Sequence, residues 1–470
     1  MTTVANTENV LKVLFDYNKW WNTGAVPAEY LRDYKRSIYS DVFQGLNDMA
    51  FRRIVILNGA RRTGKSTIMY QIIDTLLEKV DPKSIILVSF DHPLLKLLTI
   101  EDILEIYKNS IADSGEVYLF LDEIQYSKDW SQHLKIIYDL SPKVHVIATG
   151  SVSSAIVKES KESGLGRFLI IPVPTLSFSE YLKIKKVDVP EIDLKNVDPF
   201  KLYELPLQRQ TDIMMKLDKL QLEFLNYIQI GGFPENILSD NITKANRLLR
   251  EDVIDKAIKK DIPEVFDIRN TLDLERIFLY LCYNSGSLIN IEAIAKELNG
   301  ISRITIEKYI SYLESANLIY ICKPTDIRGK GVLKLQNKIY IADSSIRNSV
   351  LLNNVLTDPE ELGILVEGVV YRHIKYHFQK DMLGVGYFKT DSKGKEIDIV
   401  VMHNQKVKLL AEVKYREQAE IKETDAIVTY ALAAPNLVIT KRGLDFGLKN
   451  HENGKKIYRI PAHVLLYLLG

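Results

Sequence analysis

The sequence has only two cysteines, Cys282 and Cys322, among 470 residues. They lie in apolar surroundings without the paired spacing of a disulfide framework or a zinc site, so we expect two reduced core residues. The sequence also has no cysteine–histidine nucleophile arrangement and no glycine–serine–glycine nucleophile elbow. His373 and His377 are four residues apart, but the glutamate of an H-E-x-x-H zinc motif is missing, which favours a helix-face pair.

Long apolar runs are absent as well: none approaches the roughly 18 residues of a membrane span. The first residues lack a basic segment followed by an apolar one, so we expect no signal peptide and a cytoplasmic protein without membrane contacts. Charge of one sign is not in excess, since the net charge is +1. No overall field then draws the chain to nucleic acid, and any basic surface must be local.

A phosphate-binding loop is the most specific motif in the chain. It follows the apolar run 52–57 and leads into a segment with helical spacing of apolar residues. The pattern is G-x-x-x-x-G-K-[ST], in which glycines let backbone N–H groups converge on an anion at a helix N-terminus. Lys65 is predicted to neutralise the β- and γ-phosphates and Ser66 to ligate Mg²⁺. The predicted nucleotide-binding residues are Gly59, Ala60, Arg61, Arg62, Thr63, Gly64, Lys65, Ser66 and Thr67.

An apolar strand that ends in two carboxylates follows downstream, at 117–125. Asp122 is predicted to hold the Mg²⁺ ion through water or Ser66. Glu123 is predicted to orient and polarise the attacking water, because proteins catalyse phosphoryl transfer mainly by positioning and charge stabilisation. The alternative is an N-cap acid followed by a surface glutamate, which the preceding phosphate loop makes the weaker interpretation.

Strands and helices alternate between residues 51 and 177, which predicts a parallel sheet covered by helices on both faces. Ligands bind beyond the carboxyl ends of such strands. Thr149 and Ser151 follow one of these strands, and either is a candidate sensor of the γ-phosphate. A plain turn residue is the alternative for each.

A segment between residues 272 and 343 has the pattern of three helices followed by two short apolar runs, typical of a winged helix. The predicted recognition helix has a net charge of −1, which does not suit a phosphate surface. The predicted wing has four cations opposed only by Asp326, namely Arg328, Lys330, Lys334 and Lys338. Both a DNA contact through this wing and a purely structural winged helix remain open.

The C-terminal segment contains a second candidate site. Residues 394–402 and 406–416 predict a hairpin, on which Asp398, Glu412 and Lys414 would share one face. Glu367, on an amphipathic helix upstream, would add a carboxylate. Two carboxylates can hold Mg²⁺ or Mn²⁺, and a lysine can help to activate water for attack on a phosphodiester. The alternative is a surface ion cluster.

Several of these motifs, with GRFLIIPVPTLSFSEYL (166–182) and GGFPE (231–235), resemble a family of bacterial and archaeal AAA+ ATPases with a C-terminal restriction-endonuclease-like domain. The resemblance implies nucleotide binding at the phosphate loop, hydrolysis at Asp122 and Glu123, and sensing at Ser151. It also implies that Glu367, Asp398, Glu412 and Lys414 form a PD-(D/E)xK nuclease site. Arg167 resembles an arginine finger supplied to a neighbouring subunit of a homo-oligomer; a surface arginine at a strand start is the alternative.

We therefore predict an α/β multidomain protein: a P-loop AAA+ parallel sheet with a helical lid, a winged helix and a C-terminal restriction-endonuclease-like α/β domain. Gly231 and Gly232 are interpreted as a lid hinge, a helix C-cap, or both. The predicted segments are a helical lead-in (1–47), the ATPase core (48–189), the lid (190–270), the winged helix (271–345) and the nuclease-like domain (346–470).

The predicted function is Mg²⁺-dependent ATP hydrolysis, coupled to a DNA-binding winged helix and a metal-dependent nuclease. The expected ligands are ATP and ADP, with DNA as a candidate partner. The alternative is an ATP-switched regulatory or scaffold protein whose nuclease-like domain is a non-catalytic binding module.

Overall fold

The computed structural model describes residues 7–470 except 49, 113–114, 152–165, 299, 326, 328–335, 353–354, 390–394 and 453. The chain forms two compact units. The first comprises Met1–Pro174, Lys256–Arg269 and Ser315–Asn317, and the second comprises Thr175–Asp255, Asn270–Glu314 and Leu318–Gly470. No helix among the described residues is long and apolar enough to cross a membrane.

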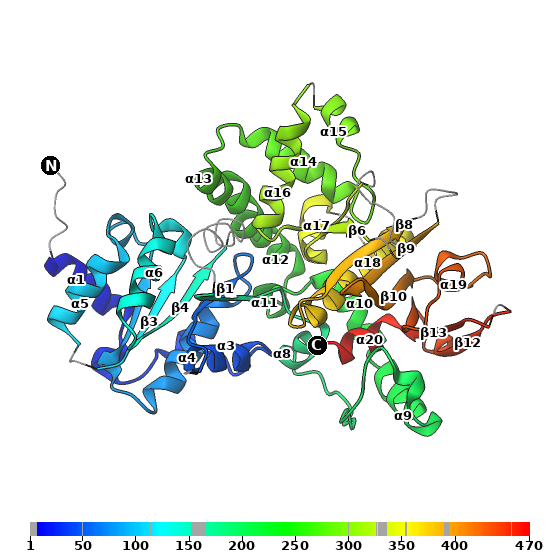
Figure 1. Cartoon of the computed structure of the whole chain (residues 1–470), viewed down its shortest axis with the longest axis horizontal. Helices are drawn as coiled ribbons and strands as arrows, with labels where there is room; N and C mark the ends of the chain where they lie inside the picture. Colours follow the sequence, from blue (N-terminus) through cyan, green and yellow to red (C-terminus); the bar gives the residue numbers. More distant parts are fainter. Residues whose placement is uncertain are drawn as a thin grey trace. The chain divides into compact units, whose positions relative to one another are not determined.

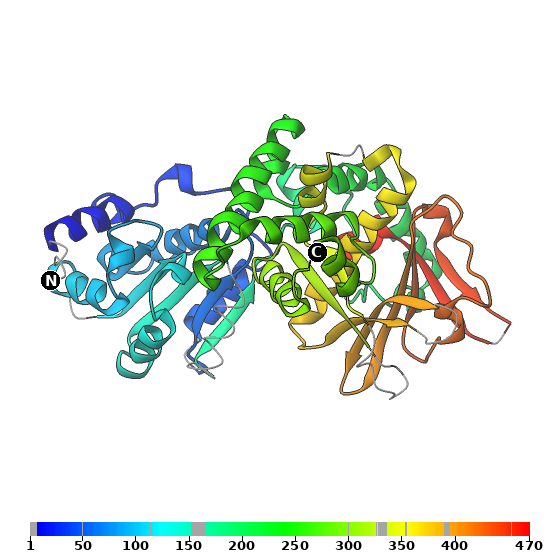
Figure 2. The same ribbon diagram turned by 90° about the horizontal axis from the view of Figure 1, so that it is seen from above.

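The first unit is built on a five-stranded parallel sheet of order β2-β3-β4-β1-β5. Its strands lie side by side in the blue to teal part of the chain (Figures 1 and 2). Nearly every strand residue of β1–β4 is buried, as expected for a sheet covered on both faces. The parallel α/β sheet predicted from the sequence is therefore confirmed. The strands are β1 (Ile54–Asn58), β2 (Ile85–Ser89), β3 (Val117–Asp122), β4 (Val144–Gly150) and β5 (Phe168–Pro172).

Helices cover this sheet and an N-terminal segment closes one of its edges. Trp20 and Trp21 each donate their indole N–H to the carbonyl of Ile85, at 3.1 and 2.7 Å. Asn18 exchanges two hydrogen bonds with the backbone of Leu87. Because β2 is an edge strand, these side chains satisfy backbone groups that would otherwise be open to pairing. The main helices are α1 (Thr7–Tyr17), α2 (Trp20–Thr23), α3 (Tyr39–Asn47), α4 (Lys65–Leu77), α5 (Ile100–Ser110), α6 (Trp130–Leu140) and α13 (Ile262–Phe266).

The second unit is built on an eight-stranded mixed sheet of order β12-β13-β11-β10-β9-β8-β6-β7. The predicted hairpin of the C-terminal segment is present as β9 and β10, which pair antiparallel. The two apolar runs of the predicted wing, β6 and β7, belong to this same sheet, because β6 pairs in parallel with β8. The strands are β6 (Ile319–Pro324), β7 (Lys338–Ile341), β8 (Gly384–Lys389), β9 (Glu396–His403), β10 (Lys406–Lys414), β11 (Asn436–Thr440), β12 (Gly447–Asn450) and β13 (Lys456–Pro461).

The helices of the second unit include the three expected between residues 272 and 318, as α14, α15 and α16. The helices of the second unit are α8 (Phe178–Ile184), α9 (Leu207–Asp218), α10 (Gln221–Ile230), α11 (Pro234–Ile237), α12 (Ile242–Leu249), α14 (Thr271–Tyr283), α15 (Ile291–Glu297), α16 (Arg303–Ser315), α17 (Ser344–Leu351), α18 (Pro359–Gln379), α19 (Ala426–Thr429) and α20 (Ala462–Leu468).

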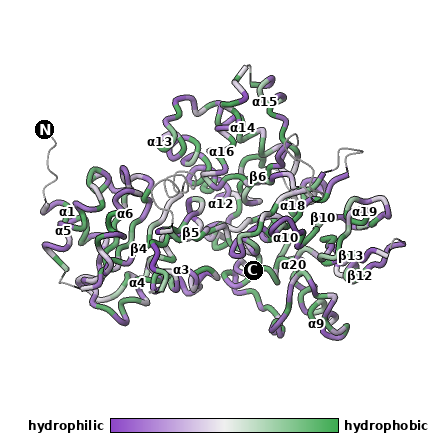
Figure 3. Tube along the Cα trace, in the orientation of Figure 1, coloured by the Kyte–Doolittle hydropathy of each residue, from purple (hydrophilic) through white to green (hydrophobic). Residues whose placement is uncertain are grey.

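Hydrophobic and hydrophilic residues interleave along both units (Figure 3).

A buried carboxylate, Asp343, organises the middle of the second unit. It accepts hydrogen bonds from the backbone N–H of Gly232 at 3.1 Å, from Thr175 Oγ1 at 2.6 Å and from the Arg372 guanidinium at 2.6 Å. Gly231 caps the C-terminus of α10 with φ of 81°, and a Cβ there would lie 2.2 Å from Asp343 Oδ1. Only glycine fits this contact. The C-cap interpretation of Gly231 is confirmed, while the hinge stays a prediction.

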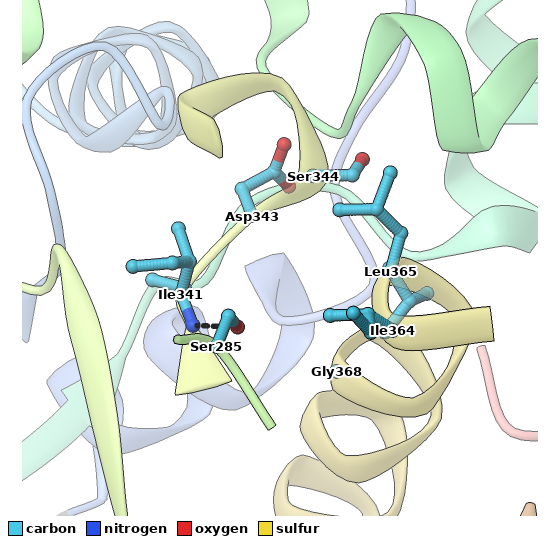
Figure 4. A pocket seen from close by; sticks show the side chains of 9 residues that line it. Ser285, Ile341, Asp343, Ser344, Ile364, Leu365 and Gly368 are labelled. Carbon is cyan, nitrogen blue, oxygen red and sulfur yellow. Dashed lines mark hydrogen bonds between the residues drawn. The ribbon is translucent and has the colours of Figure 1, made fainter. Parts of the chain in front are cut away.

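A small pocket lies next to this carboxylate, between the end of β7, the start of α17 and α18 (Figure 4). Ser285 Oγ lies at its edge and accepts a hydrogen bond from the backbone N–H of Ile341 at 3.2 Å. Ile364, Leu365 and Gly368 of α18 form another side. The pocket lining is mostly apolar and we assign no ligand to it.

Candidate functional site

The phosphate loop connects β1 to α4 in the strand–loop–helix arrangement that the motif requires. Gly64 precedes α4 with φ of 93°, a conformation that favours glycine. At Gly59 a Cβ would lie 2.1 Å from the carbonyl oxygen of Val173, so a side chain would displace the neighbouring backbone. The two motif glycines therefore have separate steric reasons for being there.

The loop curls around the ammonium group of Lys65, which is buried. Lys65 Nζ donates hydrogen bonds to the carbonyls of Gly59 at 2.9 Å and Ala60 at 2.7 Å, and burial lowers the pKa of this lysine. Thr63 Oγ1 donates to the Ala60 carbonyl at 3.0 Å. From the N-terminal segment, the Arg36 guanidinium donates to the Thr63 carbonyl at 3.0 Å. These bonds join the loop to the side chains of Lys65 and Arg36.

Ser66 and Asp122 lie in contact, as the motif pair predicts. Ser66 Oγ is 3.1 and 3.2 Å from the two carboxylate oxygens of Asp122. Thr149 Oγ1 donates a hydrogen bond of 2.6 Å to Asp122 Oδ1. Burial, and then the nearby Glu123, raises the pKa of Asp122. A hydroxyl beside one carboxylate fits a Mg²⁺ ion that takes its remaining oxygens from phosphates and water.

Glu123 follows at the carboxyl end of β3 in the left-handed backbone region, with φ of 52°. Its N–H donates to Thr149 Oγ1 at 3.0 Å. The Gln125 amide donates both to Glu123 Oε2, at 2.5 Å, and to Ser151 Oγ, at 3.0 Å. The structure thus brings Glu123 and both sensor candidates together, with Gln125 as a bridge that the sequence reasoning did not identify.

Arg61 of the phosphate loop has two partners that the sequence reasoning missed. Its guanidinium donates to both carboxylate oxygens of Asp261, at 2.5 and 2.8 Å, and to the Tyr126 hydroxyl at 2.8 Å. Tyr126 in turn donates to Asp261 at 2.8 Å. Burial opposes the charge on Arg61, but the Asp261 carboxylate more than offsets it and raises the pKa of the guanidinium. Arg62, by contrast, is exposed.

Arg167 is not part of this constellation. It precedes β5 at the amino end of the sheet, where its carbonyl accepts the N–H of Ile54, the first residue of β1. The phosphate loop follows the opposite, carboxyl end of β1. The guanidinium forms a two-bond contact with Asp139, at 2.9 and 3.2 Å. Action on the site of a second chain remains a prediction.

The second candidate site gathers its four predicted residues from α18, β9 and β10. The register pairs Ala411 with Ile399, one position from Glu412 and Asp398. Asp398 Oδ2 accepts the backbone N–H of Val413 at 2.9 Å. Lys414 Nζ lies 3.4 Å from Glu412 Oε1 and also pairs with Asp425. Glu367 reaches the same cluster through Lys338.

Lys338 corrects the sequence prediction. The charge pattern groups it with the cations of a predicted wing that could contact DNA, and that placement is wrong for Lys338, because its side chain is only 5% exposed. Lys338 Nζ lies 3.0 Å from Glu367 Oε1, 2.5 Å from Glu396 Oε1 and 3.3 Å from Asp398 Oδ1. The other predicted wing residues, Asp326, Arg328, Lys330 and Lys334, lie outside the described residues.

Burial dominates the electrostatics of this cluster. It raises the pKa of Glu367 to about 7, with Asp398 as the second cause, and raises that of Glu412 to about 7. Both oxygens of Asp398 are engaged, one by Lys338 and the other by Val413. Among the described residues, no group of three or more His, Cys, Asp or Glu side chains is arranged to hold a metal ion. The Lys338 ammonium lies 3.3 Å from Asp398 Oδ1, and the divalent ion between Asp398 and Glu412 stays a prediction.

The histidines and cysteines behave as the sequence predicts. His373 is buried, accepts the N–H of Phe178 at Nε2 and lies 2.7 Å from the Val369 carbonyl at Nδ1. Burial lowers its pKa to about 3. Cys282 and Cys322 are buried free thiols.

Comparison with known families agrees with this geometry at the level of the domain. Residues 51–182 match a family described as "AAA domain". Residues 221–357 and 362–463 match two families described as "Domain of unknown function", DUF8612 and DUF4143. Residues 51–182, most of which lie in the first unit, are therefore similar to an AAA domain, in agreement with the phosphate loop and the five-stranded parallel sheet.

Relatives in two organisms extend over more of the chain. An "Uncharacterized protein" of Haemophilus influenzae is 29% identical over 307 residues, which are 63% of this chain and 69% of the relative. The "Uncharacterized protein MJ1544" of Methanocaldococcus jannaschii is 27% identical over 410 residues, 86% of this chain and 84% of the relative. The similarity thus spans both units.

Similar solved structures include the Aeropyrum pernix Orc1 protein in complex with DNA. That alignment has 11% identity and a TM-score of 0.31, and covers 72% of this chain and 97% of the other. AMPPCP-bound DnaA from Aquifex aeolicus follows with 18% identity, a TM-score of 0.26, and 61% and 92% coverage. Whole chains do not superpose closely at such values. The assignment of the AAA domain rests on the family match and on the sheet.

Proposed function

We propose that the protein hydrolyses ATP with Mg²⁺ at the phosphate loop of its first unit. The observation that supports this most directly is the contact of Ser66 with Asp122 beside a loop curled around Lys65. A hydroxyl, a carboxylate and an ammonium are the groups that a Mg²⁺–triphosphate requires from such a site.

The remaining side chains have proposed roles in the same reaction. Lys65 exchanges its carbonyl contacts for the β- and γ-phosphates, and Asp122 holds the metal together with Ser66. Glu123 orients the attacking water, while Thr149 and Ser151 sense the γ-phosphate from the end of β4. The bridge from Gln125 to Glu123 and Ser151 supports a concerted response of this edge to the nucleotide.

Steady-state ATP turnover of the full chain tests this proposal. We expect Mg²⁺-dependent phosphate release that Lys65→Ala lowers by about 100-fold or more, the size typical for removing one charge-stabilising donor. Lys108→Ala, on the exposed face of α5, serves as the matched lysine control and should retain full turnover. Equal turnover of wild type and Lys65→Ala would reject the proposal.

A homo-oligomeric active form is the second part of the proposal and depends on Arg167. A guanidinium from a neighbouring subunit would stabilise the transition-state charge. Turnover per chain should then rise with protein concentration, and Arg167→Ala should lower turnover while leaving nucleotide affinity intact. A concentration-independent rate in a monomeric sample would contradict it.

Nucleotide state is proposed to act on the lid (190–270), the winged helix (271–345) and the nuclease-like domain (346–470), with DNA as the candidate partner. A metal-dependent nuclease at Glu367, Asp398, Glu412 and Lys414 is one proposal for the last domain. Plasmid nicking that requires Mg²⁺ or Mn²⁺ and is lost in Asp398→Ala would support it. No metal-dependent cleavage by wild type would reject it.

An ATP-switched regulatory or scaffold protein is the second candidate function. The ammonium of Lys338 among the proposed metal-binding carboxylates favours it. The candidate leads us to expect slow ATP turnover, tight nucleotide retention and no effect of Asp398→Ala. Rapid nicking of plasmid DNA would exclude it.

A further inference from the structure

One ammonium group stands at the centre of the acidic cluster in the second unit. Lys338 Nζ contacts one oxygen from each of three carboxylates, at 2.5 Å (Glu396), 3.0 Å (Glu367) and 3.3 Å (Asp398). These acids come from α18 and β9, whereas the lysine is the first residue of β7. Three carboxylate oxygens therefore surround one ammonium group, which the chain itself supplies.

The site is largely buried, and its groups make further contacts. The Lys338 side chain is 5% exposed, and the three carboxylates are 17–22% exposed. Tyr340, two residues further along β7, donates its hydroxyl to Glu367 Oε1 at 2.7 Å. Lys338 Nζ also lies 6.0 Å from the centroid of the Tyr387 ring. Burial of this kind is tolerated for a charge only when it is paired.

Carboxylates outnumber ammonium groups in the wider cluster. Glu412 Oε2 is buried without a hydrogen-bond partner among the described residues. Lys414 is already engaged by Glu412 and Asp425. Lys338 is therefore the cation that Glu367, Glu396 and Asp398 share, and its loss would remove a positive charge from the contacts of all three.

We propose that Lys338 is a resident cation that occupies the place of a divalent metal ion and keeps metal out of the cluster. A Mg²⁺ ion binds carboxylate oxygens at about 2.0–2.1 Å, and it would need the oxygens that the ammonium now holds. Metal entry would also force two cations together at a site of low exposure, where their repulsion is weakly screened. The inference deepens the second candidate function and is independent of ATP hydrolysis.

A consequence distinguishes this role from simple stabilisation. When the ammonium is removed, the three carboxylates that now surround it lose their shared cation, so Lys338→Met should create a divalent-ion site that the wild type lacks. Lys389→Met is the matched control, because Lys389 Nζ lies 4.0 Å from Glu396 Oε2 without standing between the carboxylates. That variant should gain no site.

Mn²⁺ binding, followed by electron paramagnetic resonance on the nucleotide-free full chain, tests the proposal. Wild type, Asp398→Asn, Lys338→Met and the double variant Lys338→Met/Asp398→Asn are compared, so that Mn²⁺ bound at Ser66 and Asp122 is common to all four. We expect wild type and Asp398→Asn to be identical and Lys338→Met to bind one additional Mn²⁺. Adding Asp398→Asn should weaken that site by at least about 10-fold, since outer-shell changes alone cost 10–100-fold.

Two results would overturn the proposal: a wild-type Mn²⁺ site that is lost in Asp398→Asn, or a folded Lys338→Met that gains no site. If Lys338→Met does not fold, Lys338→Met/Glu396→Gln replaces it, since this pair removes a carboxylate together with the ammonium. The same two outcomes apply. ATP turnover, measured on the same samples, reports separately on the first unit.

Discussion

The two units both place carboxylates at strand ends or on neighbouring strands, but they neutralise them differently. In the first unit Asp122 is bonded to the hydroxyls of Ser66 and Thr149, while Lys65 is bonded to backbone carbonyls. In the second unit the carboxylates are bonded to the ammonium groups of Lys338 and Lys414. Hydroxyl partners leave a carboxylate its negative charge and its affinity for a metal ion, whereas ammonium partners supply the cation themselves.

The first way to sharpen this contrast is to remove the carboxylate of the first unit that is proposed to orient and polarise the attacking water. Glu123→Gln keeps the size of the side chain but cannot accept a proton from water. Turnover should fall by about 10²–10⁴-fold, the usual worth of a positioned acid–base group, with ATP still bound. Rapid-quench turnover and equilibrium nucleotide binding would measure the two effects.

A loss of ATP binding that parallels the loss of turnover would contradict the assigned role of Glu123. Gln125→Ala is the informative companion, because it removes the bridge to Ser151 without removing the carboxylate. A smaller loss of turnover is expected there.

The second prediction concerns the ion pair that ties the phosphate loop to the segment Lys256–Arg269. Asp261→Asn leaves the Arg61 guanidinium, 15% exposed, without its charge partner. Breaking such a pair typically costs about 3–5 kcal/mol of unfolding free energy. Urea unfolding would measure this, and Tyr126→Phe, which removes only a hydroxyl, should cost about 1 kcal/mol.

Added Mg²⁺–ATP should recover more stability in Asp261→Asn than in wild type, because phosphate oxygens then provide negative charge close to Arg61. Equal unfolding curves for Asp261→Asn and wild type would show that the ion pair does not contribute to the free energy of unfolding. In that case the contact of Arg61 with the segment would be irrelevant to the nucleotide site.

The smallest expected effect is a pH dependence in the second unit. The folded state raises the pKa of Glu367 from its ordinary 4.5 to about 7. Between these values the folded chain holds a proton that the unfolded chain has released, so this group stabilises the fold at low pH and the contribution is lost as pH rises through 7. Glu367→Gln should therefore flatten the decline in stability between about pH 5 and 7.5.

Urea unfolding of wild type and Glu367→Gln at both pH values would check this. The other titrating groups are present in both proteins, so the difference in slopes reports on Glu367 and on its interaction with Asp398. An identical slope would contradict the raised pKa.

The first site could be predicted from sequence because its motifs are local. Contacts between residues far apart in the sequence could not be predicted in this way. The loop Gly59–Thr67 and the pair Asp122–Glu123 are contiguous signals with fixed geometric meaning, and the sheet follows from the alternation of its strands. Asp261 is 200 residues from Arg61, and no spacing rule connects them.

Lys338 shows a different limit of the sequence reasoning. Its positive charge suggested a place in a basic wing. In the structure, however, Lys338 and Tyr340 lie two residues apart on a short strand whose residues are all buried. Two residues apart on a strand share one face. The two-residue spacing of Lys338 and Tyr340 was therefore the signal available in the sequence. Glu396 and Asp398 have the same spacing on β9.

The most direct test of the contrast between the two carboxylate sites is a crystal structure of the full chain soaked with a non-hydrolysable ATP analogue and Mn²⁺. Anomalous scattering from manganese should show a peak beside Ser66 and Asp122, in contact with the phosphates, and none at Asp398 in wild type. A manganese peak among Glu367, Asp398 and Glu412, or no peak at Ser66, would contradict the proposed difference between the two sites.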